Sequence, residues 1–471
     1  MKTLGIDSST QGVKALVRDA ATGRVTASAS VNFGKDLPAY NCPAGFLPNG
    51  DPLVRRADPR LWLAALDLVF ARLSEACDLS EIAAIGGDGQ QHGSVYLNSA
   101  WNDALKSVAG GAEGEERLTD IFRGVFSRAE SPIWMDSSTT AEVKELDRLF
   151  PDLQARTGSP AVERFTGPQI MKFAAEHPAD WERTVRVHLV SSFLCSVLAG
   201  ADAPIDTGDG AGMNLLDLGK GAWAADICAA VAPDLVAKLP SVFLPGAKTT
   251  LTLAPYFARY GFKPGIPVVP FTGDNPASLV GTGADKPGVA VISLGTSDTF
   301  FAALPGFRTD PAGCGHVFGN PSGGCMSLAC FKNGSLAREK IRAMIGCDYA
   351  FFDETAWTQV GSADDGHLAF PYFEPEITPI HAATGIEANF DWESADDAEK
   401  VVSVIRGQVR NMYERTRWIG SFDTIRVTGG ASRSKGIRET IAAVFGAKVE
   451  VLDVPDSAAL GGAILAARAL G

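Results

Sequence analysis

The sequence predicts an α/β protein made of two domains. Segments with the composition of strands alternate along the chain with segments that have a helical apolar period, which is the order typical of α/β folds. The 471 residues exceed what one ordinary core organises and suit two domains of roughly 200 residues or more each. Two similar strand–turn–strand segments, beginning near residues 3 and 289, indicate an internal duplication.

The first half of the chain begins with a predicted hairpin. Residues 3–19 form an apolar strand, a polar turn rich in Ser, Thr and Gly, and a second strand, and residues 24–33 predict a third strand. Residues 58–76 have the apolar period of a helix. Residues 82–87 predict a short apolar strand that runs into a Gly-rich polar loop, residues 88–93.

The second half repeats this pattern. Residues 266–271 predict a buried strand, and a helix begins at residues 276–280. Residues 289–294 and 300–304 predict two strands of a second hairpin, joined by a turn of small and hydroxylic residues at 295–299.

The last part of the chain predicts one more strand–helix–strand–helix series. A strand at 424–428 is followed by the Gly-rich segment 429–434 and by a helix that ends near Phe445. A strand at 448–452 follows, and the small residues of 457–467 predict a helix that packs closely against a sheet.

Composition and charge restrict the function classes. The net charge of −13 argues against a nucleic acid partner, but an acidic protein still binds ATP when backbone amides and a metal ion contact the phosphates. No apolar run is long enough for a membrane span, and an acid follows Met1 too closely for a signal-peptide core. The eight cysteines lack C-x-x-C spacing, so we expect reduced thiols, no zinc site and a cytoplasmic location.

The tips of the two hairpins are candidate phosphate-binding turns. Turns that point several backbone amides and hydroxyl groups to one side bind anions without lysine. Asp7 lies just before the first tip, where a carboxylate can hold Mg²⁺ against nucleotide phosphates. For each tip taken alone, an ordinary hairpin with a capping Asp is the favoured interpretation.

The segment Gly429-Gly430-Ala431-Ser432 lies between a predicted strand and a predicted helix. Glycines there allow a ligand to approach the backbone, and the helix N-terminus favours an anion or a polar nucleotide edge. The segment lacks the G-x-G-x-x-G pattern of dinucleotide-binding folds.

Asp274 is a candidate catalytic base. It follows a predicted apolar strand, where open α/β sheets bind their ligands, and phosphoryl transfer needs one carboxylate beside the attacking hydroxyl group. The neighbouring Asn275 can hold an adjacent hydroxyl group. The alternative is an Asx-turn before Pro276, which is common.

His92 and Arg164 are candidate sugar-binding residues. His92 lies in a Gly-flanked loop, and its neutral imidazole can donate to a hydroxyl or carbonyl group; a structural loop histidine is equally compatible with the sequence. Arg164 can donate to a polyol, although such residues usually pair with a nearby acid at the surface.

Five motifs in order resemble those of the FGGY carbohydrate kinases, which belong to the actin-like ATPase superfamily. Within that family the sequence is similar to the animal-type branch that phosphorylates D-xylulose. The family motifs are residues 5–11, 88–93, 273–278, 293–297 and 428–432. The branch motifs are residues 89–94, 134–141, 163–167, 189–193, 212–216 and 330–336.

This resemblance implies two actin-like (ribonuclease H-like) α/β domains with a central cleft. The N-terminal, sugar-binding domain would span residues 1–250 and the C-terminal, nucleotide-binding domain residues 251–471. It implies ATP-dependent phosphorylation of D-xylulose to D-xylulose 5-phosphate, with ATP and Mg²⁺ as cofactors. A homodimer is a further expectation from the family.

The resemblance also implies roles for individual residues. Asp274 would be the base, and the ketose would contact His92, Arg164, Asp274 and Asn275. The nucleotide would contact Thr10, Thr296, Gly430, Ala431 and Ser434, with Asp7 near the metal. Ser434 stands where the branch often has Asn, and Tyr349 is the nearest aromatic residue after Arg342, so the adenine contacts are less well defined.

Two alternatives stay open at the level of the sequence. One is a kinase for another ketose or polyol, such as ribulose, sedoheptulose or erythritol. The other is a non-catalytic actin-like sugar-binding protein, which the presence of both Asp7 and Asp274 argues against, since a binding module needs neither a metal nor a base.

Overall fold

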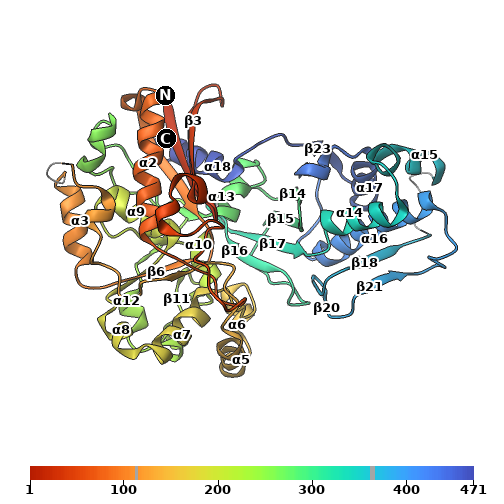
Figure 1. Cartoon of the computed structure of the whole chain (residues 1–471), viewed down its shortest axis with the longest axis horizontal. Helices are drawn as coiled ribbons and strands as arrows, with labels where there is room; N and C mark the ends of the chain where they lie inside the picture. Colours follow the sequence, from red (N-terminus) through yellow and green to blue (C-terminus); the bar gives the residue numbers. More distant parts are fainter. Residues whose placement is uncertain (112–114, 361–365) are drawn as a thin grey trace. The chain divides into compact units, whose positions relative to one another are not determined.

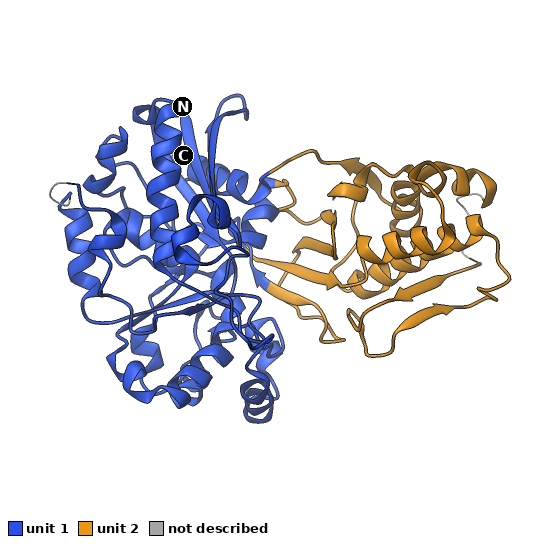
Figure 2. Ribbon diagram, viewed as in Figure 1, with its two compact units in different colours: residues 1–281, 318–323, 456–471 blue, residues 282–317, 324–455 orange. Residues whose placement is uncertain are grey.

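The chain divides into two compact units, each with its own sheet and helices (Figure 2). The computed structural model describes residues 1–111, 115–360 and 366–471. Unit 1 consists of residues 1–281, 318–323 and 456–471, and unit 2 of residues 282–317 and 324–455. In the part of the chain that the structure describes, no helix combines the length and apolar character needed to span a bilayer.

The sheet of unit 1 has five strands in the order β13-β5-β1-β2-β3, of which β3 is labelled in Figure 1. The predicted hairpin is confirmed as β1 (Lys2–Ser8) and β2 (Gly12–Asp19), and β3 (Val25–Asn32) continues it antiparallel to β2. On the other side of β1, the strands β5 (Ile82–Gly89) and β13 (Thr272–Gly273) run parallel to it.

Helices cover both faces of this sheet, because its strands alternate between two apolar surfaces. Leu4 and Ile6 share a core with α2 (Arg60–Ala76) and α9 (Val190–Ala199). On the opposite face α18 (Ser457–Arg468) lies so close that a Cβ atom on Gly5 would be 1.8 Å from the Ala459 carbonyl oxygen. The predicted small-residue helix at the end of the chain is therefore confirmed, and it belongs to the unit that begins the chain.

The remainder of unit 1 consists of shorter elements, and part of them surrounds a second apolar core. Its strands pair two by two: β4 (Arg56–Ala57) with β7 (Ser131–Pro132), β6 (Ser94–Leu97) with β8 (Arg186–Leu189), β9 (Ile205–Asp206) with β12 (Val242–Phe243), and β10 (Leu216–Asp217) with β11 (Ala222–Trp223). Further helices of unit 1 are α1 (Phe33–Asp36), α3 (Trp101–Ala109), α4 (Leu118–Ile121), α5 (Thr140–Leu149), α6 (Leu153–Thr157), α7 (Thr166–Glu176), α8 (Pro178–Arg183), α10 (Thr207–Gly210), α11 (Ala225–Val231), α12 (Leu235–Lys238) and α13 (Asp274–Gly281).

The sheet of unit 2 repeats the topology of the first sheet. Its order is β16-β17-β15-β14-β22-β23, in which β14 pairs antiparallel with β15 and parallel with β22, as β1 does with β2 and β5. The predicted duplication thus extends over five strands. The strands are β14 (Val289–Leu294), β15 (Asp298–Leu304), β16 (His316–Gly319), β17 (Cys325–Phe331), β22 (Thr424–Thr428) and β23 (Lys448–Val451).

Helices and two small hairpins accompany this second sheet. The helices are α14 (Ser335–Ile345), a π-helical turn (Phe351–Thr355), α15 (Ala356–Val360), α16 (Asp397–Thr416) and α17 (Lys435–Phe445). The strands β18 (Ala369–Tyr372) and β21 (Gly385–Ala388) pair with each other, as do β19 (Glu376–Ile377) and β20 (Ile380–His381).

Two predictions differ from the structure. The strand predicted at 266–271 is wrong: only single bridges form at Pro267 and Val268, and the ladder resumes at 272–273, because Pro267 and Pro270 have no N–H to donate. The predicted boundary at residue 250 differs from that of the units, since residues 251–281 supply β13 and α13 to unit 1.

Candidate functional site

Three aspartates lie at the carboxyl ends of β1, β5 and β13, the parallel strands of the five-stranded sheet in unit 1. Asp7 and Asp88 are register partners near the ends of β1 and β5, and Asp274 follows β13 directly as the first residue of α13. The carboxyl ends of parallel strands are where open α/β sheets bind ligands. The structure thus brings the predicted base and the predicted metal ligand to one edge of one sheet.

The carboxyl group of Asp274 is enclosed and locally bonded. Its Oδ1 accepts hydrogen bonds from the backbone N of Asn275, at 2.8 Å, and from Asn275 Nδ2, at 3.0 Å. Asn275 Nδ2 also donates to Gln91 Oε1 at 2.9 Å. Burial, followed by the negative charge of Asp7, raises the pKa of Asp274 to about 7. At neutral pH the group is therefore divided between its acid and base forms.

Asp88 was expected in a loop and not as a site residue, but it belongs to this carboxylate group. It is fully buried, and neither of its carboxylate oxygens has a hydrogen-bond partner. Burial and the neighbouring Asp7 raise its pKa well above the ordinary range. Asp88 also follows an apolar run, as Asp7 does, but the glycines on both sides of it indicated a turn.

Two further buried acids, Asp206 and Asp209, were also missed. Asp206 caps α10 by accepting hydrogen bonds from the backbone N of Gly208 and Asp209, and burial raises its pKa to about 6. Asp209 accepts a short hydrogen bond from Ser191, and its pKa is raised well above the usual range by burial. Their carboxyl groups follow no apolar run, so no local sequence pattern marked them.

His92 is held firmly next to this edge. Its backbone has φ +69°, which is unusual for a residue with a side chain, and its ring stacks on Phe165 at 4.3 Å between centroids. Nδ1 lies 2.8 Å from the carbonyl oxygen of Gly212 and must donate to it. In the neutral ring Nε2 is then an acceptor, whereas the sequence led us to expect a donor. Arg164 places its guanidinium 5.7 Å from the centroid of the same Phe165 ring.

The first hairpin tip is fastened by a tryptophan. Trp134 Nε1 donates to Thr10 Oγ1 at 2.7 Å. Because the indole N–H only donates, the Thr10 hydroxyl must accept this bond, and its own hydrogen remains able to point to an anion. Asp136, two residues further on, accepts hydrogen bonds from Ser138 and from the backbone N of Arg55.

In unit 2, Gly430, Ala431 and Ser434 line one pocket of about 360 Å³. Ser434 also caps α17 through Ile437 N. Opposite them the pocket is lined by residues of α14 and of the segment after it, including Arg338, Arg342, Tyr349 and Phe352. The guanidinium of Arg342 lies 4.3 Å from the centre of the exposed Tyr349 ring. The sequence analysis singled out Tyr349 but did not identify Arg338 or Phe352.

Thr296 does not line that pocket, but it contacts helix α14, whose residues do. The tip residues 295 and 296 accept backbone hydrogen bonds from Ser335, at 3.0 Å, and Leu336, at 3.5 Å, at the start of α14. The second tip and the first turn of α14 therefore form one connected piece of backbone within unit 2.

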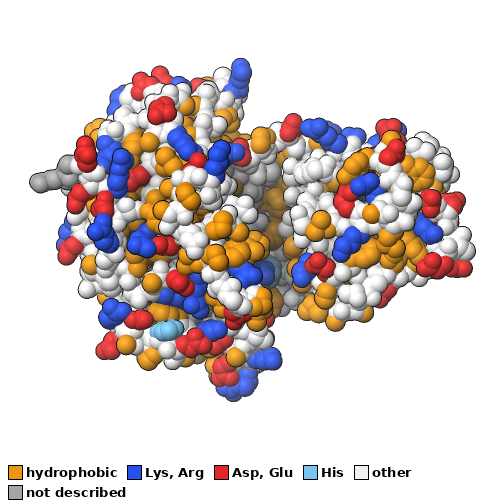
Figure 3. Space-filling view, viewed as in Figure 1, with side chains coloured by type: hydrophobic (Ala, Val, Ile, Leu, Met, Phe, Trp, Pro, Cys, Tyr) orange, Lys and Arg blue, Asp and Glu red, His pale blue; other side chains and the backbone are white. Residues whose placement is uncertain are grey.

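The surface seen in Figure 3 carries acidic and basic side chains interspersed over both units, within the described residues. This mixture differs from the continuous basic surface that proteins use to bind nucleic acid.

Comparison with known proteins identifies the class of protein to which this fold and site belong. Residues 130–281 match the N-terminal domain, and residues 290–470 the C-terminal domain, of the FGGY family of carbohydrate kinases. The first match ends at residue 281, where the long segment of unit 1 also ends. The protein is thus a phosphotransferase with an alcohol group as acceptor, of the actin-like fold.

The chain belongs to the FGGY family of carbohydrate kinases. It is 38% identical to the xylulose kinase of Mus musculus, over 99% of this chain and 86% of that protein. It is 38% identical to xylulose kinase 2 of Arabidopsis thaliana, with the same coverage of 99% and 86%. Among solved structures, a xylulose kinase from Rhodospirillum rubrum superposes with a TM-score of 0.82 at 19% identity, over 100% of this chain and 90% of the other, and shows the same fold.

Proposed function

We propose that this protein transfers the γ-phosphoryl group of ATP to a terminal hydroxyl group of D-xylulose, giving D-xylulose 5-phosphate and ADP. Support for the substrate comes from relatives named xylulose kinase in an animal, a plant and the yeast Schizosaccharomyces pombe, each matching 99% of the chain. The observation that carries the chemistry is the enclosed carboxyl group of Asp274, at the ends of parallel strands and with a pKa raised to about 7.

Asp274 acts as the general base in this proposal. As the sugar oxygen attacks the γ-phosphorus, its proton passes to the Asp274 carboxylate, a new O–P bond forms, and the bond between phosphorus and the ADP oxygen breaks. A base whose pKa lies near the working pH is both available and strong enough to accept a proton. The two hydrogen bonds from Asn275 hold the carboxyl group in one orientation.

The sugar contacts assigned to this site are His92, Arg164, Asp274 and Asn275. The neutral His92 ring accepts a hydrogen bond from a sugar hydroxyl group at Nε2, because Nδ1 donates to Gly212. Both hydrogens of the Asn275 amide are directed to Asp274 and Gln91, so Asn275 offers its carbonyl oxygen to a hydroxyl donor. Arg164 supplies a cationic donor.

The nucleotide contacts are divided between three segments. Gly430, Ala431 and Ser434 bind the nucleoside in the pocket beside Tyr349. Thr10 and Thr296, at the two hairpin tips, donate to the phosphates through their hydroxyl groups and neighbouring backbone amides.

Asp7 has the chemistry of a ligand for Mg²⁺. Its Oδ1 is buried without a hydrogen-bond partner, and carboxylate oxygens are the protein ligands that Mg²⁺ prefers. When bound, the cation neutralises charge on the nucleotide phosphates. We also propose that the protein acts as a homodimer and in a reducing compartment such as the cytoplasm, where its eight free cysteines persist as thiols.

Replacing Asp274 by Ala tests the catalytic assignment. We expect kcat to fall by about 10²–10⁴ because the proton of the attacking hydroxyl group loses its acceptor. ADP binding, measured by calorimetry, should change by less than about twofold, since the nucleotide contacts lie elsewhere. The exposed Asp103→Ala in the same unit is the matched control and should keep full activity. Near-normal turnover of Asp274→Ala would exclude this residue as the base.

An ADP-release assay over several sugars tests the substrate. D-xylulose should give the highest kcat/KM among D-xylulose, D-ribulose, sedoheptulose and erythritol, because the relatives that match the whole chain are xylulose kinases. A higher kcat/KM for one of the other three would overturn the choice of sugar but not the base.

A further inference from the structure

Asp88 is a buried carboxylate without any satisfied oxygen. Its side chain is fully buried, and apart from the contact with the Asp7 carboxyl group, its carboxylate oxygens lack a hydrogen-bond partner. A charged group in this condition is strongly unfavourable unless a proton or a cation compensates it. The side chains with the largest electrostatic effect on it are Asp7, Asp274 and Asp209, all of which are acids.

The strand geometry brings Asp88 and Asp7 together. They are register partners on the adjacent parallel strands β5 and β1, and their carboxyl groups contact each other. Both lie on the face of the sheet that α18 covers, because Gly5 and Gly86, two residues earlier on each strand, abut that helix. Asp7 Oδ1 is also buried without a partner. Lys14, the basic residue opposite Asp7, is paired with Asp456.

Two buried carboxylates in contact require a proton or a cation to compensate their negative charge. A phosphoryl-transfer enzyme supplies it in the divalent cation that accompanies the nucleotide, and Mg²⁺ is commonly held by one or two carboxylates together with phosphate oxygens and water. Among the described residues no group of three or more His, Cys, Asp or Glu side chains is placed to hold a metal. A pair of carboxylates is therefore an open site that leaves coordination positions for the phosphates.

We propose that Asp88 is a second protein ligand for the divalent cation, which is held jointly by Asp7 from β1 and Asp88 from β5. This inference rests on the proposed function, because the cation is the one that arrives with ATP. It assigns a role to a residue on the strand that neighbours the predicted metal ligand in the sheet, and it accounts for the buried oxygens of both side chains.

Binding of Mn²⁺ to the full-length protein tests this assignment without any turnover. Free Mn²⁺ is measured by electron paramagnetic resonance while the ion is titrated into the protein, with and without saturating ADP. We expect Asp88→Asn to weaken Mn²⁺ binding at least about tenfold in both conditions, as Asp7→Asn does, since loss of one interaction in a metal site typically costs 10–100-fold in affinity.

The alternative is that Asp88 holds a proton and donates it to Asp7. Asn is a neutral donor of nearly the same shape, so Asp88→Asn would then keep the Mn²⁺ affinity of the wild-type protein, and that result would overturn the proposal. The matched control is Asp209→Asn, a buried acid of the same group whose carboxylate already accepts a hydrogen bond from Ser191. It should bind Mn²⁺ within about twofold of the wild-type protein.

Two measurements keep the test decisive. Thermal unfolding without metal should show Asp88→Asn at least as stable as the wild-type protein, because the substitution removes repulsion from Asp7; if Asp88→Asn does not fold, Asp88→Ser replaces it in the titration. The wild-type protein should unfold at a higher temperature when Mn²⁺ is added, and no such rise would also overturn the proposal. Wild-type activity with D-xylulose is measured separately, so failure of the sugar assignment is distinguishable from failure of the metal assignment.

Discussion

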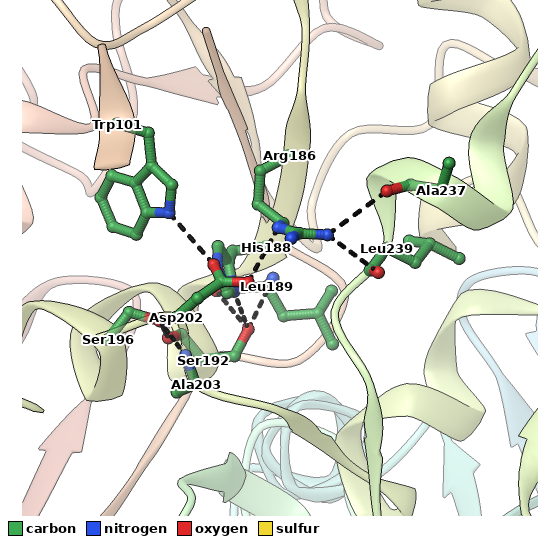
Figure 4. Close-up of polar contacts among 10 residues, drawn as sticks. All are labelled: Trp101, Arg186, His188, Leu189, Ser192, Ser196, Asp202, Ala203, Ala237 and Leu239. Carbon is green, nitrogen blue, oxygen red and sulfur yellow. Dashed lines mark hydrogen bonds and ion pairs between the residues drawn. The ribbon is translucent and has the colours of Figure 1, made fainter. Parts of the chain in front are cut away.

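At the scale of single residues, buried polar groups in unit 1 are compensated in different ways. His188 is fully buried, yet both ring nitrogens have partners: Nε2 lies 2.9 Å from Asp202 and Nδ1 lies 3.0 Å from Ser192 (Figure 4). Asp202 in turn accepts from Trp101 and pairs with Arg186. This cluster is satisfied within the protein, whereas Asp88 is not. The first arrangement stabilises a fold, and the second indicates a ligand.

The His188 cluster predicts a pH dependence of stability. Burial lowers the pKa of His188 below its ordinary 6.5, and the contact with Asp202 opposes this shift only in part. As the pH falls through about 6.5, the unfolded chain therefore takes up a proton that the folded protein resists, and the free energy of unfolding decreases. The same stability returns as the pH rises through this window.

Urea unfolding at pH 7.5 and 5.5 measures this effect through the fluorescence of the protein's tryptophans, which include Trp101 beside the His188 ring. His188→Gln should lose less stability on acidification than the wild-type protein. The half-exposed His367 of unit 2 is the control, and His367→Gln should follow the wild-type protein. Equal losses for His188→Gln and the wild-type protein would show that this ring does not contribute.

Part of the site could be predicted from single residues. Asp7 and Asp274 follow apolar runs and were singled out for that reason, whereas Asp88 lies between glycines, which are usual in turns. Those glycines serve packing instead: a Cβ atom on Gly89 would lie 2.7 Å from Ser191 N, so α9 approaches the strand too closely for a side chain. Close packing between distant segments leaves no local sequence pattern. The prediction therefore ended the strand at residue 87, whereas β5 continues to Gly89.

At the scale of elements, the second hairpin tip is tied to helix α14 by a buried ion pair. Arg338 contacts both oxygens of Asp298, at 2.7 and 2.8 Å, and both side chains are almost entirely buried. Asp298 is the first residue of β15, directly after the tip, and Arg338 lines the pocket beside Ser434. The pair thus connects the proposed phosphate contacts with the proposed nucleoside contacts inside one unit.

Arg338→Met tests the contribution of this ion pair to stability and to nucleotide binding. The substitution leaves Asp298 buried without its cation, so we expect a loss of about 3–5 kcal/mol in the free energy of unfolding. Because the tip containing Thr296 loses its anchor, KM for ATP should rise several-fold more than KM for the sugar. Arg417→Met removes an exposed ion pair of the same unit and should change neither quantity appreciably. Equal rises in both KM values would contradict a specific role at the nucleotide.

The elements that were predicted, such as the hairpin β1–β2 and helix α2, have local apolar periods, whereas α14 and α16 were not predicted. The exception at 266–271 is informative. Its apolar residues suit a buried strand, and the segment does run beside β5, but Pro267 and Pro270 interrupt the ladder. Pairing with β5 occurs instead at Thr272 and Gly273, so Asp274 follows directly after a paired residue.

At the scale of the whole molecule, the chain passes between the two units four times. Residues 456–471 return to unit 1, where α18 packs on β1, β5 and α13. The two similar hairpins indicated from the sequence that the two sheets have similar strand orders. The return of the C-terminal helix to unit 1 was not predicted, because nothing in residues 457–467 shows which of the two similar sheets they cover.

Deletion of residues 456–471 should therefore unfold unit 1. The deletion exposes the sheet face that carries Gly5, Gly86 and Leu16, against which α18 packs closely. We expect loss of soluble protein or rapid proteolysis within residues 1–281, whereas deletion of residues 470–471 alone should be tolerated. Intact, protease-resistant unit 1 in the longer deletion would show that α18 is dispensable.

The return of the C-terminal helix also has a consequence during synthesis. Residues 282–455 are translated after the long segment of unit 1 and before α18. Their translation takes roughly 10 to 35 s at about 5–20 residues per second. Throughout that interval the sheet of unit 1 lacks the helix that covers the face of Gly5, Gly86 and Leu16. The first unit to be translated is thus the last to be completed.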